Sequence, residues 1–294
     1  MEASTDHIEA PADQAALGPG WVVEPRREGF VARIRDVWRY RRLLRFFAKK
    51  AFQRLYARTI LGWSWILIRP LAPLVVSTFV FGRVLGVGSQ GMPYFLFLLV
   101  GMSTWDLFNQ ATLWGTRSLE MNRSFLTRIY IPRLILPMAS MTPAVLNFTI
   151  HLGIIVGALV YYRFTRGVLY LTPLNLPWAV LAVVMAMLLA LGISLWTSVP
   201  AMVARDVRFT LTYVMNIWMF LTPVLYPLPR TGEYGWLLAL NPMAAVVNTF
   251  KHGVLGLDTL NLPDIGIALL VIAVVLGSGL WFFGRAEGTA ADKA

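Results

Sequence analysis

The sequence lacks cysteine and contains few charged residues and few histidines. Without cysteine among its 294 residues, the chain can form no disulfide, no thiolate nucleophile and no cysteine-ligated metal site. Its three histidines, His7, His151 and His252, are too far apart in sequence for a ligand spacing such as i, i+4, so we expect no metal site. Only 14% of the residues are charged and 57% are hydrophobic, whereas soluble domains carry about 25% charged residues. With a mean hydropathy of +0.62, this composition predicts an integral membrane protein.

The few charges are biased toward positive sign, with 26 Lys and Arg against 15 Asp and Glu and a net charge of +11. In a soluble protein this excess would suggest nucleic-acid binding. In a membrane protein it is expected at the cytoplasmic face, where Lys and Arg meet anionic lipid headgroups.

The N-terminal region divides into two parts. Residues 1–29 are rich in acidic residues, Ala, Pro and Gly and have no apolar core of a signal peptide, so we expect a disordered cytoplasmic tail. Residues 30–61 place apolar side chains near helical spacing among basic ones, which predicts an amphipathic helix on the membrane surface. Its basic residues include Arg41, Arg42, Arg45, Lys49, Lys50 and Arg54. Two interpretations remain open: a simple juxtamembrane anchor, or an anchor that also contacts a partner.

Six apolar runs follow, each near the roughly 20 residues that a helix needs to cross a bilayer. We predict spans at 64–86, 94–115, 134–160, 177–199, 209–227 and 264–284. They form one six-span domain over residues 62–286, followed by a cytoplasmic tail at 287–294. The predicted fold class is an all-α integral membrane protein.

The distribution of Lys and Arg predicts the orientation. With the N-terminus inside, 21 of the 26 basic residues fall in inside segments and five in outside segments, so both termini are expected in the cytoplasm. Arg205 and Asp206 then form a tight cytoplasmic turn between spans 4 and 5, and we expect them to pair with each other or with the N-terminal helix. Charges at the bilayer centre would cost on the order of 3 kcal/mol each, which favours this interfacial placement.

The segment between spans 5 and 6 is too apolar for a water-exposed loop and too often broken by Pro and Gly for a single span. Residues 222–256 therefore predict a re-entrant pair of short helices on the extracytoplasmic side. Irregular backbone at membrane depth requires cover by protein or a water-filled cavity, so this segment is a candidate part of a translocation path.

Five motifs, in order from about residue 50 to 256, resemble those of the type-2 ABC export permeases, in the branch that exports polysaccharides and polyol phosphates such as O-antigen or teichoic acid. They are TILGWSWILIRPL, GMSTWDLFNQ, SLEMNRSFLTRIYIPRLILP, ARDVRFTLTYVMNIWMFLTPVLYPL and LNPMAAVVNTFKHGVLG. Two positions depart from the family pattern. Lys50-Ala51 with Leu55-Tyr56 replaces an Arg-Asp and Arg-Tyr pattern before span 1, and Lys251 stands where the family often has Arg.

The resemblance implies a homodimer in the bacterial inner membrane with two copies of a separate ATPase subunit. The chain has no Gly-x-x-x-x-Gly-Lys-Ser/Thr loop, so ATP and Mg are expected on that partner and no cofactor on this chain. The family's N-terminal helix and the loop after span 2 contact the ATPase, which implies coupling roles here for Glu120, Asn122, Arg123, Arg128 and Arg133. A solvated basic loop is the alternative. The family's exit gate corresponds to Pro223, Tyr226, Asn241, Pro242 and Lys251.

Aromatic and small residues supply further candidates among the 38 aromatic residues (11 Trp, 10 Tyr and 17 Phe). Sugars present C–H faces that pack on aromatic rings, so aromatic side chains can line a path for a polymer; packing and interfacial belts are the alternative roles. The pore-lining candidates are Tyr56, Trp63, Trp65, Trp105, Phe108, Tyr213, Trp218 and Phe220. Asp106 in span 2 has no obvious cation in the membrane, and its role stays open. Gly153 and Gly157 permit close helix packing within or between subunits.

The predicted function is the permease subunit of an ATP-driven exporter of a lipid-linked polysaccharide, with no enzymatic activity of its own. The alternatives are a drug or small-lipid exporter of the same fold and, from another class, a membrane-embedded transferase acting on a lipid carrier. The transferase would need a cluster of acids or histidines near one membrane face, and the sequence shows no such motif.

Overall fold

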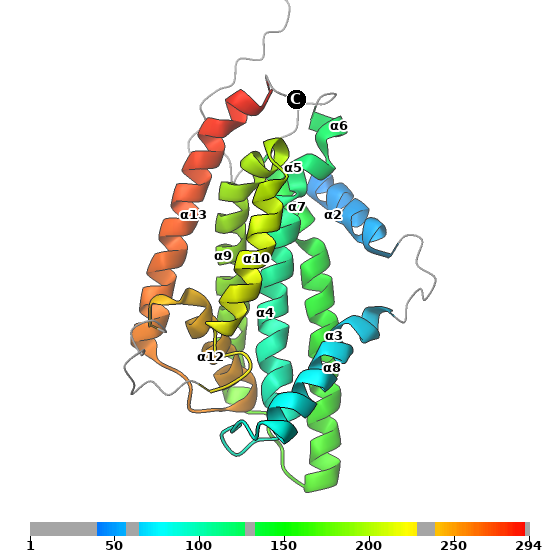
Figure 1. Ribbon diagram of the computed structural model, residues 1–294, viewed down its shortest axis with the longest axis vertical. Coiled ribbons are helices and arrows are strands. Elements are labelled where there is room, and N and C mark those ends of the chain that lie inside the picture. Colours follow the sequence, from blue (N-terminus) through cyan, green and yellow to red (C-terminus); the bar gives the residue numbers. More distant parts are fainter. Residues whose placement is uncertain (1–39, 57–64, 127–132, 228–238, 292–294) are drawn as a thin grey trace, which may run out of the picture.

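The computed structural model describes residues 40–56, 65–126, 133–227 and 239–291, and all regular secondary structure in these ranges is helical (Figure 1). The elements are α2 (Arg41–Tyr56), α3 (Trp65–Ser77), the π-helix η3 (Thr78–Val84), α4 (Tyr94–Thr116), α5 (Ser118–Met121), α6 (Arg123–Leu126), α7 (Ile135–Ser140), α8 (Thr142–Arg166), the short η4 (Pro173–Asn175), α9 (Leu176–Val203), α10 (Asp206–Phe220), α12 (Pro242–Leu255) and α13 (Leu262–Ala291). The all-α class is thus confirmed for the described part of the chain.

Some of the predicted segments lie outside the described residues. They are the tail at 1–29, residues 30–39 and 57–61 of the surface helix, residues 127–132 of the loop after span 2, residues 228–238 of the predicted re-entrant segment, and residues 292–294 of the predicted C-terminal tail.

Three described helical segments are both long and apolar enough to cross a membrane: Ile135–Arg166, Pro173–Val203 and Leu262–Arg285. Helix α4 has 23 residues but carries Asp106, Asn109 and Gln110 in its middle, and Pro70–Val84 is a shorter apolar helix. With a length near that of a bilayer crossing, these helices make the chain a multi-pass membrane protein.

Helix α9 is the centre of the bundle and packs against α4, α12 and α13, while α8 packs on the other side of α4. Small residues on α9 (Ala179, Ala182, Ala186 and Ala190) are buried and allow its neighbours to approach. Glycines mark the close crossings, since a Cβ added to Gly279 of α13 would lie 2.7 Å from the Gly192 carbonyl oxygen, and one added to Gly253 of α12 would lie 2.4 Å from the Ala179 amide nitrogen. Helices α5, α6 and α7 gather at one end of the bundle, and α12 and η3 lie at the other (Figure 1).

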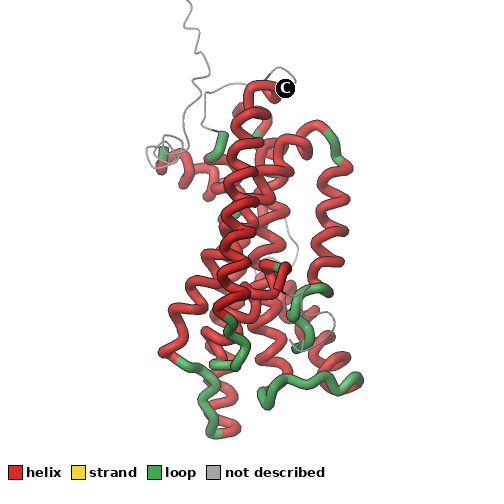
Figure 2. The backbone as a smooth tube through the Cα atoms, turned by 90° about the vertical axis from the view of Figure 1, so that its left-hand side faces the viewer, coloured by secondary structure: helices red, strands yellow, loops and turns green. Residues whose placement is uncertain are grey.

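Helix α10 is the least embedded of the long elements. It buries only Leu211 and Met215, and Figure 2 shows it at the right of the view, standing away from the other helices over much of its length. It also ends at Phe220, earlier than the span predicted to residue 227. Pro223 explains the early end, because proline lacks a backbone donor and disfavours helical backbone in the residue before it.

Two other helix ends differ from the prediction. Helix α8 continues to Arg166, where Gly167 adopts a left-handed C-cap with a φ of 67°. Helix α13 continues to Ala291 through residues that were expected to form a tail, and the alanines there favour helix. The segment predicted as span 3 is divided by a break between α7 and α8 at Met141, just before Pro143.

The buried side chains form two clusters. The larger one lies among α4, α8, α9, α12 and α13. The smaller one lies at the α5–α7 end and joins Phe47 of α2 to Leu119, Ile135, Leu195 and Phe283. Helix α2 is therefore fixed to the bundle by its own apolar face, which brings the predicted surface helix and the loop after α4 to the same end.

Candidate functional site

The α2 end of the molecule is organised around aromatic side chains. Phe47 is 3% exposed, and its ring centroid lies 5.6 Å from that of Phe125 on α6 in an edge-to-face arrangement. The Lys50 Nζ lies 3.6 Å from the centroid of the Phe125 ring, a cation–π distance. Helix α2 and the loop after α4, predicted from separate motifs, thus contact each other directly.

The same end contains an ion pair between residues 88 positions apart. Arg208 Nη1 on α10 donates to Glu120 Oε2 on α5 at 2.5 Å, and the Arg208 side chain is only 16% exposed. Glu120 was predicted as a coupling residue, whereas Arg208 was not selected. The pair connects the short helix after α4 to the first turn of α10.

The other predicted coupling residues lie near this pair. Asn122 is buried and donates from Nδ2 to the Ser118 carbonyl at 2.9 Å, while Arg123 is exposed and Arg133 half-buried. Arg128 lies outside the described residues. On α2, Arg41, Arg42, Arg45 and Lys49 are exposed, and the backbone of Arg54 is helical.

Arg205 lies in the turn between α9 and α10 and Asp206 is the first residue of α10, but the expected pairing is absent from the described part of the chain. Both side chains are exposed, and neither makes an ion pair with another described residue. The charged residue that faces the bundle here is Arg208, which lies in the first turn of α10, two positions after Asp206.

At the opposite end, one amide side chain joins α10 to α12. Asn241 Oδ1 accepts from the Met243 amide at 3.0 Å, which caps α12, and from Trp218 Nε1 at 2.9 Å. Its Nδ2 donates to the Leu221 carbonyl at 3.0 Å and to Thr222 Oγ1 at 3.1 Å. Asn241 thereby provides hydrogen-bond partners for the backbone carbonyl freed at the end of α10 and for the backbone amide freed at the start of α12.

Lys251 on α12 holds the chain just after α10. Its side chain is 1% exposed, and its Nζ donates to the carbonyls of Pro223 at 2.8 Å and Val224 at 3.3 Å. The same Nζ lies 3.4 Å from the centroid of the Phe97 ring. Gly101 leaves the necessary space, since a Cβ there would lie 2.9 Å from Lys251 Cε. Lys251 was predicted as a gate residue, and in the structure its buried amine binds the carbonyls freed by the end of α10.

The five predicted gate residues are thus close together. Pro223 and Lys251 are in contact, Asn241 directly precedes the buried Pro242, and Tyr226 donates its hydroxyl to the Phe220 carbonyl at 2.5 Å. Tyr94 of α4 donates to the Leu225 carbonyl at 2.6 Å and fixes the same segment from another side.

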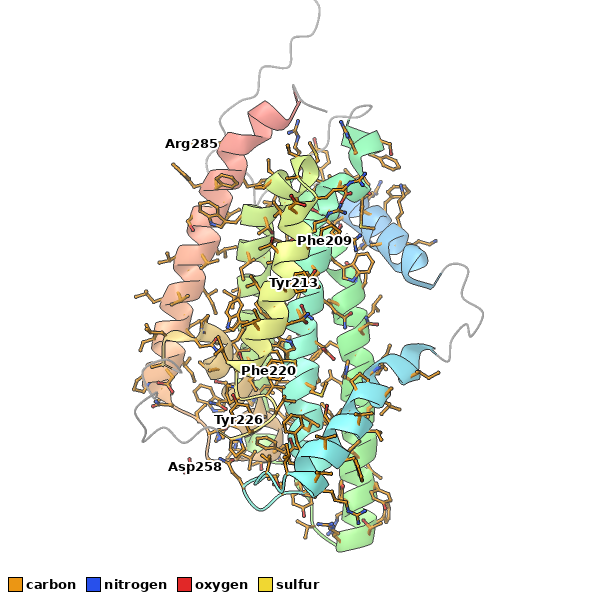
Figure 3. The ribbon with its side chains drawn as sticks, viewed as in Figure 1. Phe209, Tyr213, Phe220, Tyr226, Asp258 and Arg285 are labelled. Carbon is orange, nitrogen blue, oxygen red and sulfur yellow. The ribbon has the colours of Figure 1, made fainter. Side chains whose placement is uncertain are left out.

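The predicted pore-lining aromatics separate into two groups. Trp105, Phe108 and Trp218 form one edge-to-face cluster between α4 and α10, with centroid distances of 5.4 to 6.4 Å. Trp105 and Phe108 are buried within the chain, so they have the packing role that was the alternative to lining the polymer path. Tyr213 and Phe220 instead project from the outer face of α10, 70% and 54% exposed, in line with Phe209 (Figure 3). The side chains of Tyr56, Trp63 and Trp65 lie outside what the structure describes.

Sequence reasoning missed the partner of Asp106. His151 Nε2 on α8 lies 3.5 Å from Asp106 Oδ2 on α4, and one turn away Asn147 Nδ2 donates to Gln110 Oε1 at 2.5 Å. The two helices are antiparallel neighbours, so residues 45 positions apart meet. The signal available in the sequence was a polar i, i+4 pair in each of two consecutive apolar helices.

Two other expectations concern metal sites and glycines. Within the described residues, no group of three or more His, Asp or Glu side chains lies at metal-binding distance. Gly153 and Gly157 face open space, since no atom lies within 4 Å of the place that a Cβ would occupy on either residue. Close packing against the described part of this chain is therefore not their role.

Comparison with known proteins gives consistent matches. The ABC-2 type transporter family matches residues 42–255 of this chain. The O-antigen export system permease protein RfbA of Myxococcus xanthus is 24% identical over 222 residues, covering 74% of this chain and 82% of that protein. Two Klebsiella pneumoniae proteins of the same name are 22% and 23% identical and cover 80% and 83% of this chain and 90% and 91% of their own length. Since the family match extends from α2 to α12, the chain belongs to the ABC-2 type transporters.

Proposed function

We propose that this chain is the membrane permease subunit of an ATP-driven exporter of a lipid-linked, O-antigen-like polysaccharide. The observation that carries the proposal is its similarity to three O-antigen export permeases along 82% to 91% of their lengths. In this proposal the chain acts as a homodimer with two copies of a separate ATPase, which binds ATP and Mg. The chain itself performs no covalent chemistry.

The proposed topology has six crossings of the bacterial inner membrane with both termini in the cytoplasm. The α5–α7 end is the cytoplasmic end, supported by the positive bias of its segments, and α12 is half of a re-entrant pair at the outer end. Helix α12 supports this part of the proposal, because its 14 residues are too few to cross a bilayer.

Single cysteines test this topology, since the chain has no other thiol. A cysteine at the exposed Ala204, beside the Arg205 turn, is expected to be shielded from a membrane-impermeant thiol reagent in intact cells. A cysteine at the exposed Asp258, near the opposite end in Figure 3, is expected to react. Reaction of the Ala204 position from outside would contradict the proposed orientation.

Coupling to the ATPase is proposed for the α2 end. Glu120 and Arg208 link α5 to α10, and Phe47 and Lys50 link α2 to α6, so a force applied to this end reaches α10 through direct contacts. The segment after α10, held by Asn241 and Lys251, is the proposed exit gate. The outer face of α10, with Phe209, Tyr213 and Phe220, supplies an aromatic surface against which a sugar polymer could slide.

Deletion of the gene for this chain tests the function. We expect surface polysaccharide to disappear and lipid-linked polymer to accumulate inside the cell, because synthesis continues without a path outward. Expression of the wild-type chain should restore the surface polymer. Unchanged surface polysaccharide in the deletion strain would contradict polymer export and favour a drug or small-lipid exporter.

A further inference from the structure

A partly exposed stripe runs along the middle of α4. Met102, Asp106, Asn109 and Leu113 follow one another at i+4, i+3 and i+4, so they share one face of the helix. All four are half-buried, whereas most other residues in this part of the helix are fully buried.

The stripe lies between two neighbouring helices. On one side, Trp218 of α10 packs against Trp105 and Phe108. On the other side, His151 of α8 approaches Asp106. The face between them is therefore covered by neither α8 nor α10. Figure 1 shows α4 visible between these two helices in its middle portion.

The hydrogen bonds of His151 fix how it can interact with Asp106. His151 Nδ1 lies 3.0 Å from the Asn147 carbonyl oxygen, which can only accept, so Nδ1 carries a proton. His151 Nε2 then lies 3.5 Å from Asp106 Oδ2 and holds the carboxyl group from one side.

Two polar atoms of the stripe remain without partners. Asn109 Oδ1 is buried and has no hydrogen-bond partner, and Asp106 has no interaction other than that with His151 among the described residues. Asp106 is 28% exposed and lies at least ten residues from each end of α4, on the order of 15 Å of helix. Lipid cannot supply hydrogen bonds at this depth, so the open part of the Asp106 side chain requires water or a polar ligand.

The outer face of α8 provides the contrast. Most exposed side chains in its middle are apolar (Val145, Leu152, Val156 and Val160), as expected for contact with lipid. The exposed Thr149 donates its hydroxyl to the Val145 carbonyl at 3.0 Å, so it needs no outside partner. The α4 stripe differs because it contains the polar residues Asp106 and Asn109, although both surfaces are partly exposed in the single chain.

We propose that the α4 stripe faces the water-filled export path and that Asp106, oriented by His151, and Asn109 bind hydroxyl groups of the polymer in transit. This proposal rests on the proposed function and assigns it a polyhydroxylated ligand. A carboxyl group accepts hydrogen bonds from sugar hydroxyls, and a side-chain amide group both donates and accepts them, without reading one particular sugar. Weak binding of successive sugars suits a polymer that must be released at each step to pass through the membrane.

Cysteine accessibility tests the water contact, in native membranes that contain the permease with its ATPase. Asn109→Cys and Met102→Cys are treated with a small, charged methanethiosulfonate, and Val156→Cys on the outer face of α8 is the control. Because only the thiolate reacts, we expect the two stripe positions to react at least about tenfold faster than the control. A stripe cysteine that reacts only with a hydrophobic maleimide, or forms a disulfide with a second copy, would overturn the proposal. Accessibility is read without polymer, so this result does not depend on the proposed function being correct.

Polymer binding is tested on the same positions. With polymer synthesis active, labelling of Asn109→Cys should slow, while labelling of Asp258→Cys outside the path should not change. An accessible stripe with no protection by polymer would overturn the ligand assignment. Failure of the proposed function itself would be seen separately, as unchanged surface polymer in the deletion strain.

Export rates of Asp106 and Asn109 variants measure how much these side chains contribute to polymer export. Asp106→Leu is expected to lower the export rate about tenfold at equal membrane levels, whereas Asp106→Asn, which keeps hydrogen-bonding atoms, should retain most of it. Asn109→Leu is expected to lower export without disturbing the Asp106–His151 pair, which covers the case in which Asp106→Leu is not inserted. Equal export by the Leu and Asn variants of Asp106 would overturn the role in hydroxyl binding.

Discussion

Replacing Lys251 with methionine is expected to reduce polymer export about a hundredfold or more. The methionine has a similar length but donates no hydrogen bond, so the carbonyls of Pro223 and Val224 lose their buried partner. Leaving two buried carbonyls without a donor costs about 3 kcal/mol, which corresponds to about two powers of ten. The segment after α10 would then leave its position against Phe97 and α4. Surface polymer per cell, at equal permease levels, measures the effect.

A glycine pair provides the matched control for this prediction. Gly101→Ala adds a Cβ that would lie 2.9 Å from both Lys251 Cε and the Val224 carbonyl oxygen, so it should displace the lysine and lower export. Gly157→Ala adds the same atom to a helix position with nothing within 4 Å and should export normally. Normal export by Lys251→Met, or equal export by the two alanine variants, would show that Lys251 does not hold the gate.

Reversing one charge of the Glu120–Arg208 pair is expected to lower ATP-driven export about tenfold. In Glu120→Arg two guanidinium groups face each other, and in Arg208→Glu two carboxylates do, at a contact that is only partly exposed. The double variant restores opposite charges and should recover most of the export. Export and polymer-stimulated ATP hydrolysis are measured together, because loss of coupling affects both.

Arg117 supplies the control for the charge reversal. It is exposed at the same end and does not pair with Glu120, so a defect in Arg117→Glu, whatever its size, should not be rescued by Glu120→Arg. Failure of rescue in the Glu120–Arg208 double variant would mean that the pair does not transmit between α5 and α10.

The positions of the long helices could be predicted from the sequence because apolar runs of bilayer length mark the segments that cross the membrane. The prolines after α10 and the Asn-Pro start of α12 also marked real helix ends, since proline acts through local backbone geometry. The predicted end of span 5 differed from the end of α10, and the cause was again local. Helix α10 ends before Pro223 because the residue preceding a proline avoids helical backbone.

The contacts of charged residues could not be predicted in the same way. Arg208, rather than Arg205 or Asp206, reaches Glu120, and the choice depends on which side of α10 faces the bundle. Lys251 was assigned to the exit gate, but its burial depends on the space left by Gly101 and on the carbonyls after Pro223. Likewise, Asp106 has no cation near it in the sequence, and only the packing of α8 brings His151 beside it. Each of these pairings depends on how whole helices pack. For Asp106 and His151 the polar i, i+4 pairs mark candidate residues, but only the packing of α4 on α8 shows which of them meet.

The chain is proposed to provide the path for an ATP-driven polysaccharide exporter. The most direct measurement reconstitutes the permease with its ATPase in liposomes, supplies lipid-linked polymer on the ATPase side, and measures polymer that becomes accessible to a glycan-cleaving enzyme on the other side. We expect transfer that requires ATP and both subunits and that is lost in Lys251→Met. Transfer without ATP, or ATP hydrolysis that moves no polymer while moving a small lipid, would contradict this function.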